Sequence, residues 1–105
     1  MSKITMEAKF ILKAIAGYVR QDRAAGRCTD LPKSADGIRQ VQALIQAAQY
    51  KCHHCKREVR LTDIQEGRFD PIMTTLDRTN NALGHSIANC VVSCLSCNRQ
   101  RRDNY

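Results

Sequence analysis

Two cysteine pairs with the spacing of a metal-binding turn define the chemistry available to this chain: Cys52-x-x-Cys55 and Cys94-x-x-Cys97. In each pair a tight turn directs two thiolates towards one ion. Four sulfur ligands are the number that a closed tetrahedral zinc site uses, so the sequence predicts a structural Zn²⁺ bound by these four residues. His53 and His54 lie inside the first turn. We expect both side chains to point to solvent, with zinc binding as the alternative.

Several polar residues accompany the cysteine pairs at characteristic positions. Leu76-Asp77-Arg78 lies between the pairs, and Gly84-His85, Asn89 and Cys94-Leu95-Ser96-Cys97-Asn98 follow it. On these motifs, residues 51 to 103 resemble the HNH, or ββα-metal, endonucleases. The zinc-stapled subgroup that includes phage recombination endonuclease VII is the most similar. The resemblance covers about half of the chain and does not include residues 1–50.

This resemblance implies a metal-dependent DNA endonuclease that hydrolyses phosphodiester bonds. By position, Asp77 at a strand end and Asn98 after the last cysteine would hold a catalytic Mg²⁺ or Mn²⁺. A carboxylate and an amide oxygen are hard ligands that suit these ions. Asn89 would support the loop beside the site through hydrogen bonds to the backbone. Taken singly, Asp77 is also explained as a turn residue and Asn98 as a helix N-cap.

One position departs from the family pattern. The residue after the strand-end acid is usually the histidine that activates water, and here it is Arg78. Arginine stays protonated and cannot act as a general base, although it can bind phosphate. We therefore expect His85 to act as the base, or the hydrated cation to supply the nucleophile, with a loop-stabilising hydrogen bond as the structural alternative for His85. The replaced histidine also leaves open a catalytically inactive, zinc-dependent nucleic-acid-binding module on the same fold.

The charge of the chain favours a polyanionic partner. The sequence contains 17 Lys and Arg against 10 Asp and Glu, a formal net charge of +7, and nucleic acid is the usual polyanion. We expect three arginines after Asn98 to contact phosphates of duplex or branched DNA, with a solvated face as the alternative: Arg99, Arg101 and Arg102. A zinc-held module with a protein partner is a further alternative.

Chain length and cysteine usage set further limits. A chain of 105 residues forms one domain, or one domain with an appendage, and the cysteine-containing half needs a metal ion to compensate for a small core. No stretch approaches the ~18 apolar residues of a membrane helix, and residues 1–4 begin no apolar run of a signal peptide. We expect an intracellular, reducing compartment in which the thiolates bind metal.

Hydrophobic spacing predicts two helices in the first half. Apolar residues recur at helical intervals from Ile4 to Val19 and from Ile38 to Ala48, and Ser34 is a good N-cap for the second helix. We expect a helical extension over residues 1–50 that packs as a scaffold. Homodimer formation is one alternative. The other is a DNA-binding arm that uses basic residues of the first helix: Lys9, Lys13, Arg20, Arg23 and Arg27.

The second half predicts short strands and a final helix. β-forming residues favour strands near Val59, over residues 72–76 and over residues 90–92, and Asn98 is expected to begin a helix that runs to Asp103. With the cysteine pairs at the base of the hairpin, we predict an α+β fold. Two N-terminal helices precede a zinc-bound ββα-metal, treble-clef-like core over residues 51–105.

Overall fold

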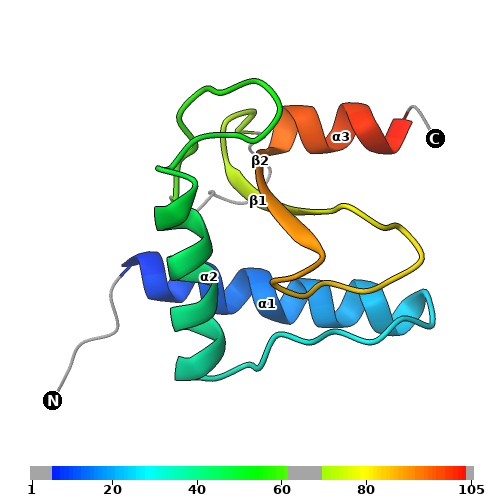
Figure 1. Ribbon diagram of the computed structural model, residues 1–105. Helices are drawn as coiled ribbons and strands as arrows, with labels where there is room; N and C mark the ends of the chain where they lie inside the picture. Colours follow the sequence, from blue (N-terminus) through cyan, green and yellow to red (C-terminus); the bar gives the residue numbers. More distant parts are fainter. Residues whose placement is uncertain (1–5, 62–69, 104–105) are drawn as a thin grey trace, which may run out of the picture.

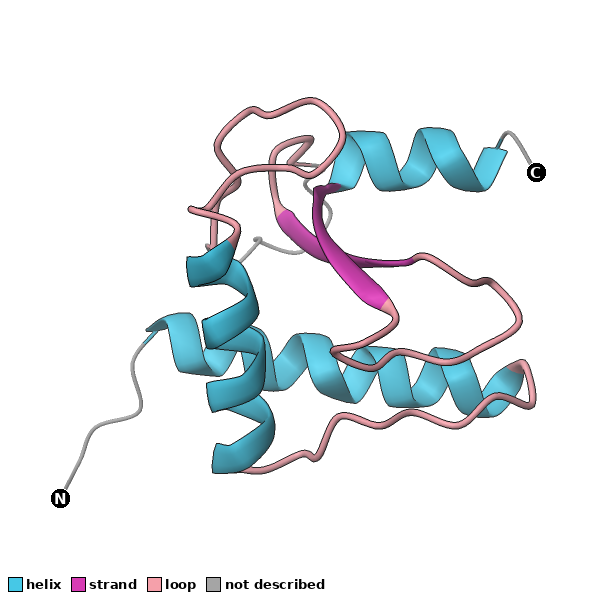
Figure 2. Ribbon diagram, in the orientation of Figure 1, coloured by secondary structure: helices cyan, strands magenta, loops and turns pink. Residues whose placement is uncertain are grey.

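The fold is α+β, with three helices and a two-stranded antiparallel sheet in the described part of the chain. The computed structural model describes residues 6–61 and 70–103. In Figure 1 and Figure 2 the hairpin lies between the first helix and the last, and the second helix crosses the first. The elements in chain order are α1 (Met6–Ala24), α2 (Ala35–Ala47), β1 (Thr74–Arg78), β2 (Cys90–Cys94) and α3 (Leu95–Asp103).

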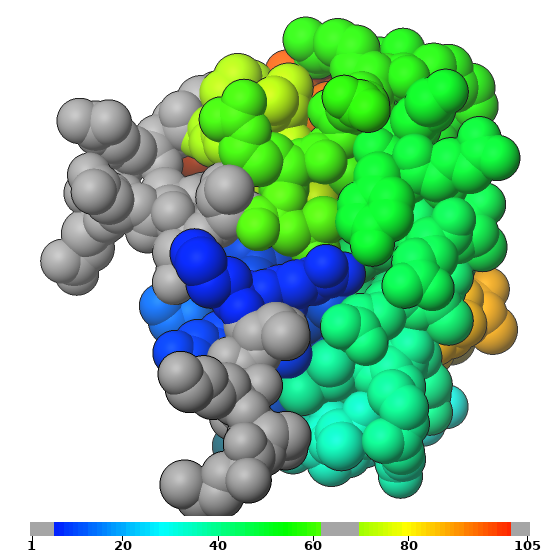
Figure 3. All heavy atoms as spheres, turned by 90° about the vertical axis from the view of Figure 1, so that its left-hand side faces the viewer, coloured from blue at the N-terminus to red at the C-terminus, as the bar shows by residue number. Residues whose placement is uncertain are grey.

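The two N-terminal helices form where the apolar spacing predicts them. Helix α1 continues beyond Val19 to Ala24, and the chain then turns at Gly26, whose φ of 74° lies in the left-handed region that glycine adopts without strain. Ser34 precedes α2 with the extended backbone of an N-cap, but its side chain makes no capping hydrogen bond. Figure 3 shows the start of α1 and the length of α2 side by side on one face of the molecule.

The hairpin sets the positions of Thr75 and Asp77 relative to the second strand. Strands β1 and β2 pair antiparallel, with Thr75 opposite Ser93 and Asp77 opposite Val91. The expected strand near Val59 is not formed among the described residues, because this segment makes only isolated bridges to two different neighbours. Helix α3 follows β2 directly and begins at Leu95. Asn98 therefore lies inside the helix, and its interpretation as an N-cap is wrong.

One apolar core joins the helices to the hairpin. The buried cluster takes side chains from α1, α2 and both strands, among them Ile11, Ile15, Val41, Ile45, Leu76 and Val92. The backbone N–H of Leu76 on β1 also donates to the hydroxyl of Tyr18 on α1 (2.9 Å). The helices of residues 1–50 thus complete the core of the part that contains the cysteines. Within the described residues, no helix is both long and apolar enough to cross a membrane.

A close backbone contact links the loop between the strands to the segment after α1. A Cβ added to Gly84 would lie 1.9 Å from the carbonyl oxygen of Cys28 and 2.8 Å from a carboxylate oxygen of Asp22. Gly84→Ala should therefore destabilise the fold by about 1–3 kcal/mol or more, because backbone atoms cannot move aside cheaply. Urea denaturation of the parent and the variant measures this change.

Gly17 provides the matched control for this substitution. It lies within α1, and an added Cβ would meet only the end of the Arg20 side chain, at 3.8 Å. Gly17→Ala should stabilise the fold by about 0.5–1 kcal/mol, because alanine loses less backbone entropy in a helix. Equal effects of the two substitutions would contradict the contact at Gly84.

Candidate functional site

The four predicted cysteine ligands converge in space. Their Sγ atoms all lie within 4.8 Å of one another, and those of Cys55 and Cys94 are 3.8 Å apart. A tetrahedral ion with Zn–S bonds of ~2.3 Å separates its sulfur ligands by about 3.8 Å. The donor set and its spacing therefore suit one metal ion such as zinc. The cluster joins the turn of the first pair to the junction of β2 and α3, where Cys94 and Cys97 lie.

N–H groups donate to three of the four sulfurs, whereas burial raises the pKa of the fourth thiol, Cys97, to about 12. In each turn a backbone N–H donates to the first sulfur: that of His54 to Cys52 and that of Cys97 to Cys94, both at 3.4 Å. Arg57 donates to Cys55 Sγ (3.4 Å), and this contact lowers the pKa of Cys55 to about 6. The thiolate form, which is the form that binds metal, is thus favoured at Cys55 near neutral pH.

Asp77 lies at the centre of a polar cluster beside the four cysteines. Its Oδ2 is 2.8 Å from His54 Nε2 and also accepts a hydrogen bond from the guanidinium of Arg101. Its Oδ1 accepts no hydrogen bond from any described residue. His54 does not point to solvent as expected, because its side chain is only 26% exposed and faces this carboxylate. The Cys-x-x-Cys spacing predicted the turn of residues 52–55 but not the direction of the His54 ring.

Asn98 faces the same side of β1 as Asp77. Its Nδ2 donates to Thr75 Oγ1 (3.0 Å), and Thr75 and Asp77, two residues apart on the strand, share one face. Within the described residues the side-chain oxygen of Asn98 accepts no hydrogen bond. Arg101 lies one turn further along α3, so the two side chains emerge from one helix face. The structure therefore brings Asp77 and Asn98 together with an oxygen of each available.

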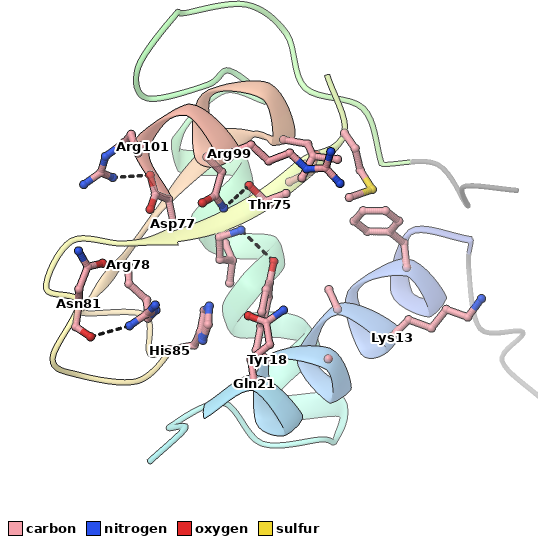
Figure 4. Close-up of a pocket in the computed structure, with 18 of the residues that line it drawn as sticks. Lys13, Tyr18, Gln21, Thr75, Asp77, Arg78, Asn81, His85, Arg99 and Arg101 are labelled. Atoms are coloured by element: carbon pink, nitrogen blue, oxygen red, sulfur yellow. Dashed lines mark hydrogen bonds and ion pairs between the residues drawn. The ribbon is translucent and has the colours of Figure 1, made fainter. Parts of the chain in front are cut away.

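Both residues line a cavity of about 620 Å³ between α1, β1 and α3. Figure 4 shows Asp77, Thr75 and Arg101 on one side of β1, and Tyr18, Arg78 and His85 on the other. Among the described residues that line the cavity, Asp77 is the one carboxylate. Five cationic residues line it: Lys13, Arg27, Arg78, Arg99 and Arg101. A cavity with this excess of positive charge attracts anions. The side chain of Arg102, the third arginine expected to contact phosphate, lies outside the described residues.

The loop between the strands is held by Arg78 and Asn89. The guanidinium of Arg78 donates to the carbonyl oxygens of Asn81 (2.8 Å) and Leu83 (3.1 Å). Asn89 donates to the carbonyl oxygens of Gly84 (2.9 Å) and Asn80 (3.1 Å), and its own side-chain oxygen accepts from the Asn80 N–H (2.9 Å). The Arg78 guanidinium therefore binds the loop that follows it, and these N–H groups do not point towards a ligand.

His85 is buried and paired with an acid that the sequence analysis did not single out. Its Nδ1 lies 3.1 Å and 3.2 Å from the two carboxylate oxygens of Asp22 on α1, and its ring stacks on Tyr18 with centroids 4.1 Å apart. Asp22 is fully buried and also accepts from Thr29 Oγ1 (2.6 Å) and Arg27 Nε (3.1 Å). The sequence did contain an indication that Asp22 is buried, because this residue continues the apolar stripe of α1 at helical spacing.

The two partners have shifted pKa values. Burial lowers the pKa of His85, and this effect outweighs the attraction of Asp22. Burial alone would raise the pKa of Asp22, but the hydrogen bonds from His85, Thr29 and Arg27 lower it well below its usual range. Burial also raises the pKa of Tyr18 to about 12. At neutral pH, His85 is therefore neutral and Asp22 is ionised.

Comparisons of this chain with protein-family models, with curated proteins and with solved structures found no match. The function of this chain is therefore indicated only by its own residues. They define an α+β protein with a cluster of four cysteines that could hold a metal ion and, beside it, a basic cavity whose described lining contains one carboxylate.

Replacing one cysteine of the cluster tests the metal site. Cys94→Ser leaves three sulfurs, so the bound metal per chain should fall and the free energy of unfolding should drop by several kcal/mol, because binding energy is folding energy in such sites. Cys28→Ser is the matched control, since Cys28 is exposed and outside the cluster. Metal analysis and denaturation of both variants measure the effect. Equal metal content in both would rule out the cluster as the binding site.

The buried histidine predicts an acid-sensitive fold. The pKa of His85 lies below its ordinary value of 6.5 in the folded state, so the unfolded chain binds more protons as the pH falls below about 6.5. The free energy of unfolding should therefore be lower at pH 5.5 than at pH 7.5. His85→Gln should reduce this difference by up to about 1 kcal/mol. The contribution of Asp22 is lost only below about pH 4, because its pKa is also lowered. An unchanged difference in the variant would contradict this assignment.

Proposed function

We propose that this chain is a metal-dependent DNA endonuclease of the HNH, or ββα-metal, type that hydrolyses phosphodiester bonds. One observation carries the proposal: Asp77 and Asn98 come from different elements, line one cavity and each keep an oxygen without a hydrogen bond from the described residues. A carboxylate and an amide oxygen suit Mg²⁺ or Mn²⁺. The basic residues around them suit a phosphate diester.

In this proposal the four cysteines hold a structural Zn²⁺. The ion would link the turn of residues 52–55 to the junction of β2 and α3, and so support both the helix that carries Asn98 and the strand that pairs with β1, which carries Asp77. A functional site needs such rigid support, because ligands must be held to within about 0.5 Å. Zinc with four thiolates has no open position and therefore takes no part in the reaction.

Asp77 and Asn98 would hold the second cation. When bound, this ion polarises the scissile phosphate, lowers the pKa of water and offsets charge on the leaving 3′ oxygen. In the hydrolysis an oxygen–phosphorus bond forms to water, and the bond from phosphorus to the 3′ oxygen breaks. Arg99 and Arg101 line the cavity where the phosphate would lie. Their charge would orient the backbone of duplex or branched DNA.

The position of His85 bears on the source of the nucleophile. His85 and Asp77 lie on different sides of β1, and Nδ1 of His85 is directed at Asp22 (Figure 4). These contacts support the structural alternative for His85, which joins the loop to α1. They favour water activated by the cation over a direct base role for His85. That base role stays a prediction.

A catalytically inactive nucleic-acid-binding module is the second candidate. The observation that favours it is the engagement of Arg78 with the loop carbonyls and of His85 with Asp22. Neither Arg78 at the usual base position nor His85, its expected substitute, is then available to activate water. This candidate keeps the zinc, the fold and the basic cavity, and differs only in cleavage.

Asp77→Ala separates the two candidates. In the nuclease, this substitution should leave the fold and the four-cysteine site intact and lower plasmid nicking by about 10²-fold or more, because the cation loses its charged ligand. Nicking of supercoiled DNA with Mg²⁺, with Mn²⁺ and with chelator measures this effect.

Asp36→Ala is the matched control for the loss of one negative charge. Asp36 lies on α2, is exposed and pairs with Arg39, outside the residues that line the cavity. The Asp36→Ala variant should nick supercoiled DNA at the rate of the parent. If the parent binds DNA but does not cut with any of these ions, the inactive module is favoured. If Asp77→Ala cuts as well as the parent, the cation site is wrong.

A further inference from the structure

A histidine from the zinc-binding turn reaches the carboxylate of the candidate cation site. His54 lies between Cys52 and Cys55, and its Nε2 is 2.8 Å from Asp77 Oδ2 although the two residues are 23 positions apart in the sequence. The His54 side chain is 26% exposed and that of Asp77 is 8% exposed. Solvent therefore reaches this contact from the histidine side.

A positive group already lies where these two side chains converge. The Nη1 atom of Arg101 contacts Asp77 Oδ2 and is 3.4 Å from His54 Nε2. One nitrogen of a guanidinium thus faces a carboxylate oxygen and an imidazole nitrogen at once. Both facing atoms are also common metal ligands. Because Asp77 Oδ2 and His54 Nε2 both face the positive guanidinium of Arg101, the same two atoms suit a metal cation.

The separation of the two donor atoms fits ligands of one ion. Octahedral ions with bonds of ~2.1 Å place neighbouring ligand atoms about 3.0 Å apart. The observed 2.8 Å between Nε2 and Oδ2 is close to this spacing. Asn98 lies on the same face of α3 as Arg101, and its side-chain oxygen accepts no hydrogen bond from the described residues. It is placed to complete one side of such a shell.

We propose that His54 is a third protein ligand of the divalent cation, beside Asp77 and Asn98, and that the guanidinium of Arg101 occupies this position until the cation binds. This assignment rests on the proposed function, because it takes Asp77 and Asn98 as ligands. The nitrogen donor changes the preferred ion. Imidazole suits transition ions, whereas Mg²⁺ favours oxygen alone, so the site selects Mn²⁺ over Mg²⁺.

The same residue connects the two metal sites. The backbone N–H of His54 donates to Cys52 Sγ (3.4 Å), so the conformation of the turn depends on the sulfur cluster. An ion held by the four cysteines thereby fixes a ligand of the second ion directly, in addition to holding β2 against α3. Hydrogen-bonded support of this kind commonly affects metal affinity by about 10- to 100-fold.

Mn²⁺ binding tests the ligand without reference to cleavage. The zinc-loaded full chain is titrated with Mn²⁺ by calorimetry, and pulsed electron paramagnetic resonance detects ¹⁴N coupling from a directly bound imidazole. The parent should show this coupling and bind Mn²⁺ more tightly than Mg²⁺. His54→Ala should abolish the coupling and weaken Mn²⁺ binding by about 10-fold or more.

His53→Ala is the matched control, because His53 is the neighbouring histidine in the same turn and its ring meets only His54 among the described rings. It should keep both the coupling and the affinity. Coupling that persists in His54→Ala, or equal loss of affinity in both variants, would overturn the assignment. Removing the competing charge with Arg101→Gln should tighten Mn²⁺ binding, and unchanged or weaker binding would overturn the role given to Arg101.

The outcomes also separate this inference from the proposed function. Imidazole-bound Mn²⁺ in a chain that never cuts DNA would support the ligand assignment and refute the nuclease. Cleavage that depends on Asp77, in a chain whose Mn²⁺ shows no nitrogen coupling, would support the nuclease and refute the role of His54.

Discussion

The fold of the second half depends on four sulfur atoms that meet within 4.8 Å. This segment contains only a hairpin of two five-residue strands and a nine-residue helix as regular elements among its described residues. Two short strands alone are only marginally stable in water. An ion bound by all four sulfurs would compensate for the small apolar core of this part, at the point where β2 passes into α3. That junction sets where α3 leaves the sheet, and so where Asn98 and Arg101 lie in the cavity.

The N-terminal helices supply the second constraint. Helix α1 contributes Ile11 and Ile15 to the shared core, and its Tyr18 accepts a hydrogen bond from the backbone of β1 at Leu76. Its buried Asp22 holds His85, and so the loop that leads into β2. A buried carboxylate is tolerated because hydrogen bonds from three residues replace its hydration. Helix α1 therefore forms one wall of the cavity.

Sequence reasoning succeeded where local spacing determines the structure. The Cys-x-x-Cys turns, the helix start after Ser34 and the β-forming run before Asp77 are local patterns, and the corresponding elements lie close to their predicted positions. It failed where the outcome depends on which distant group a side chain meets. His54 was expected to face solvent, but its ring turns to a strand 23 residues away. Spacing within a turn carries no information on such a contact.

In the proposed nuclease, the charge balance around Asp77 would make cation binding and phosphate binding depend on each other. Asp77 is the one carboxylate among the described residues that line a cavity with five cationic ones, and Arg101 now neutralises it. A divalent ion at Asp77 would displace that guanidinium by like-charge repulsion, which amounts to several kcal/mol at short range even with strong screening. The displaced arginine remains on the cavity wall, where a phosphate is the natural partner for its charge. Cation binding would thereby convert Arg101 from a partner of the protein's own carboxylate into a partner of the substrate. Arg101 can pair with Asp77 in the absence of the cation and with a phosphate in its presence, because the bound cation neutralises Asp77 in the second state.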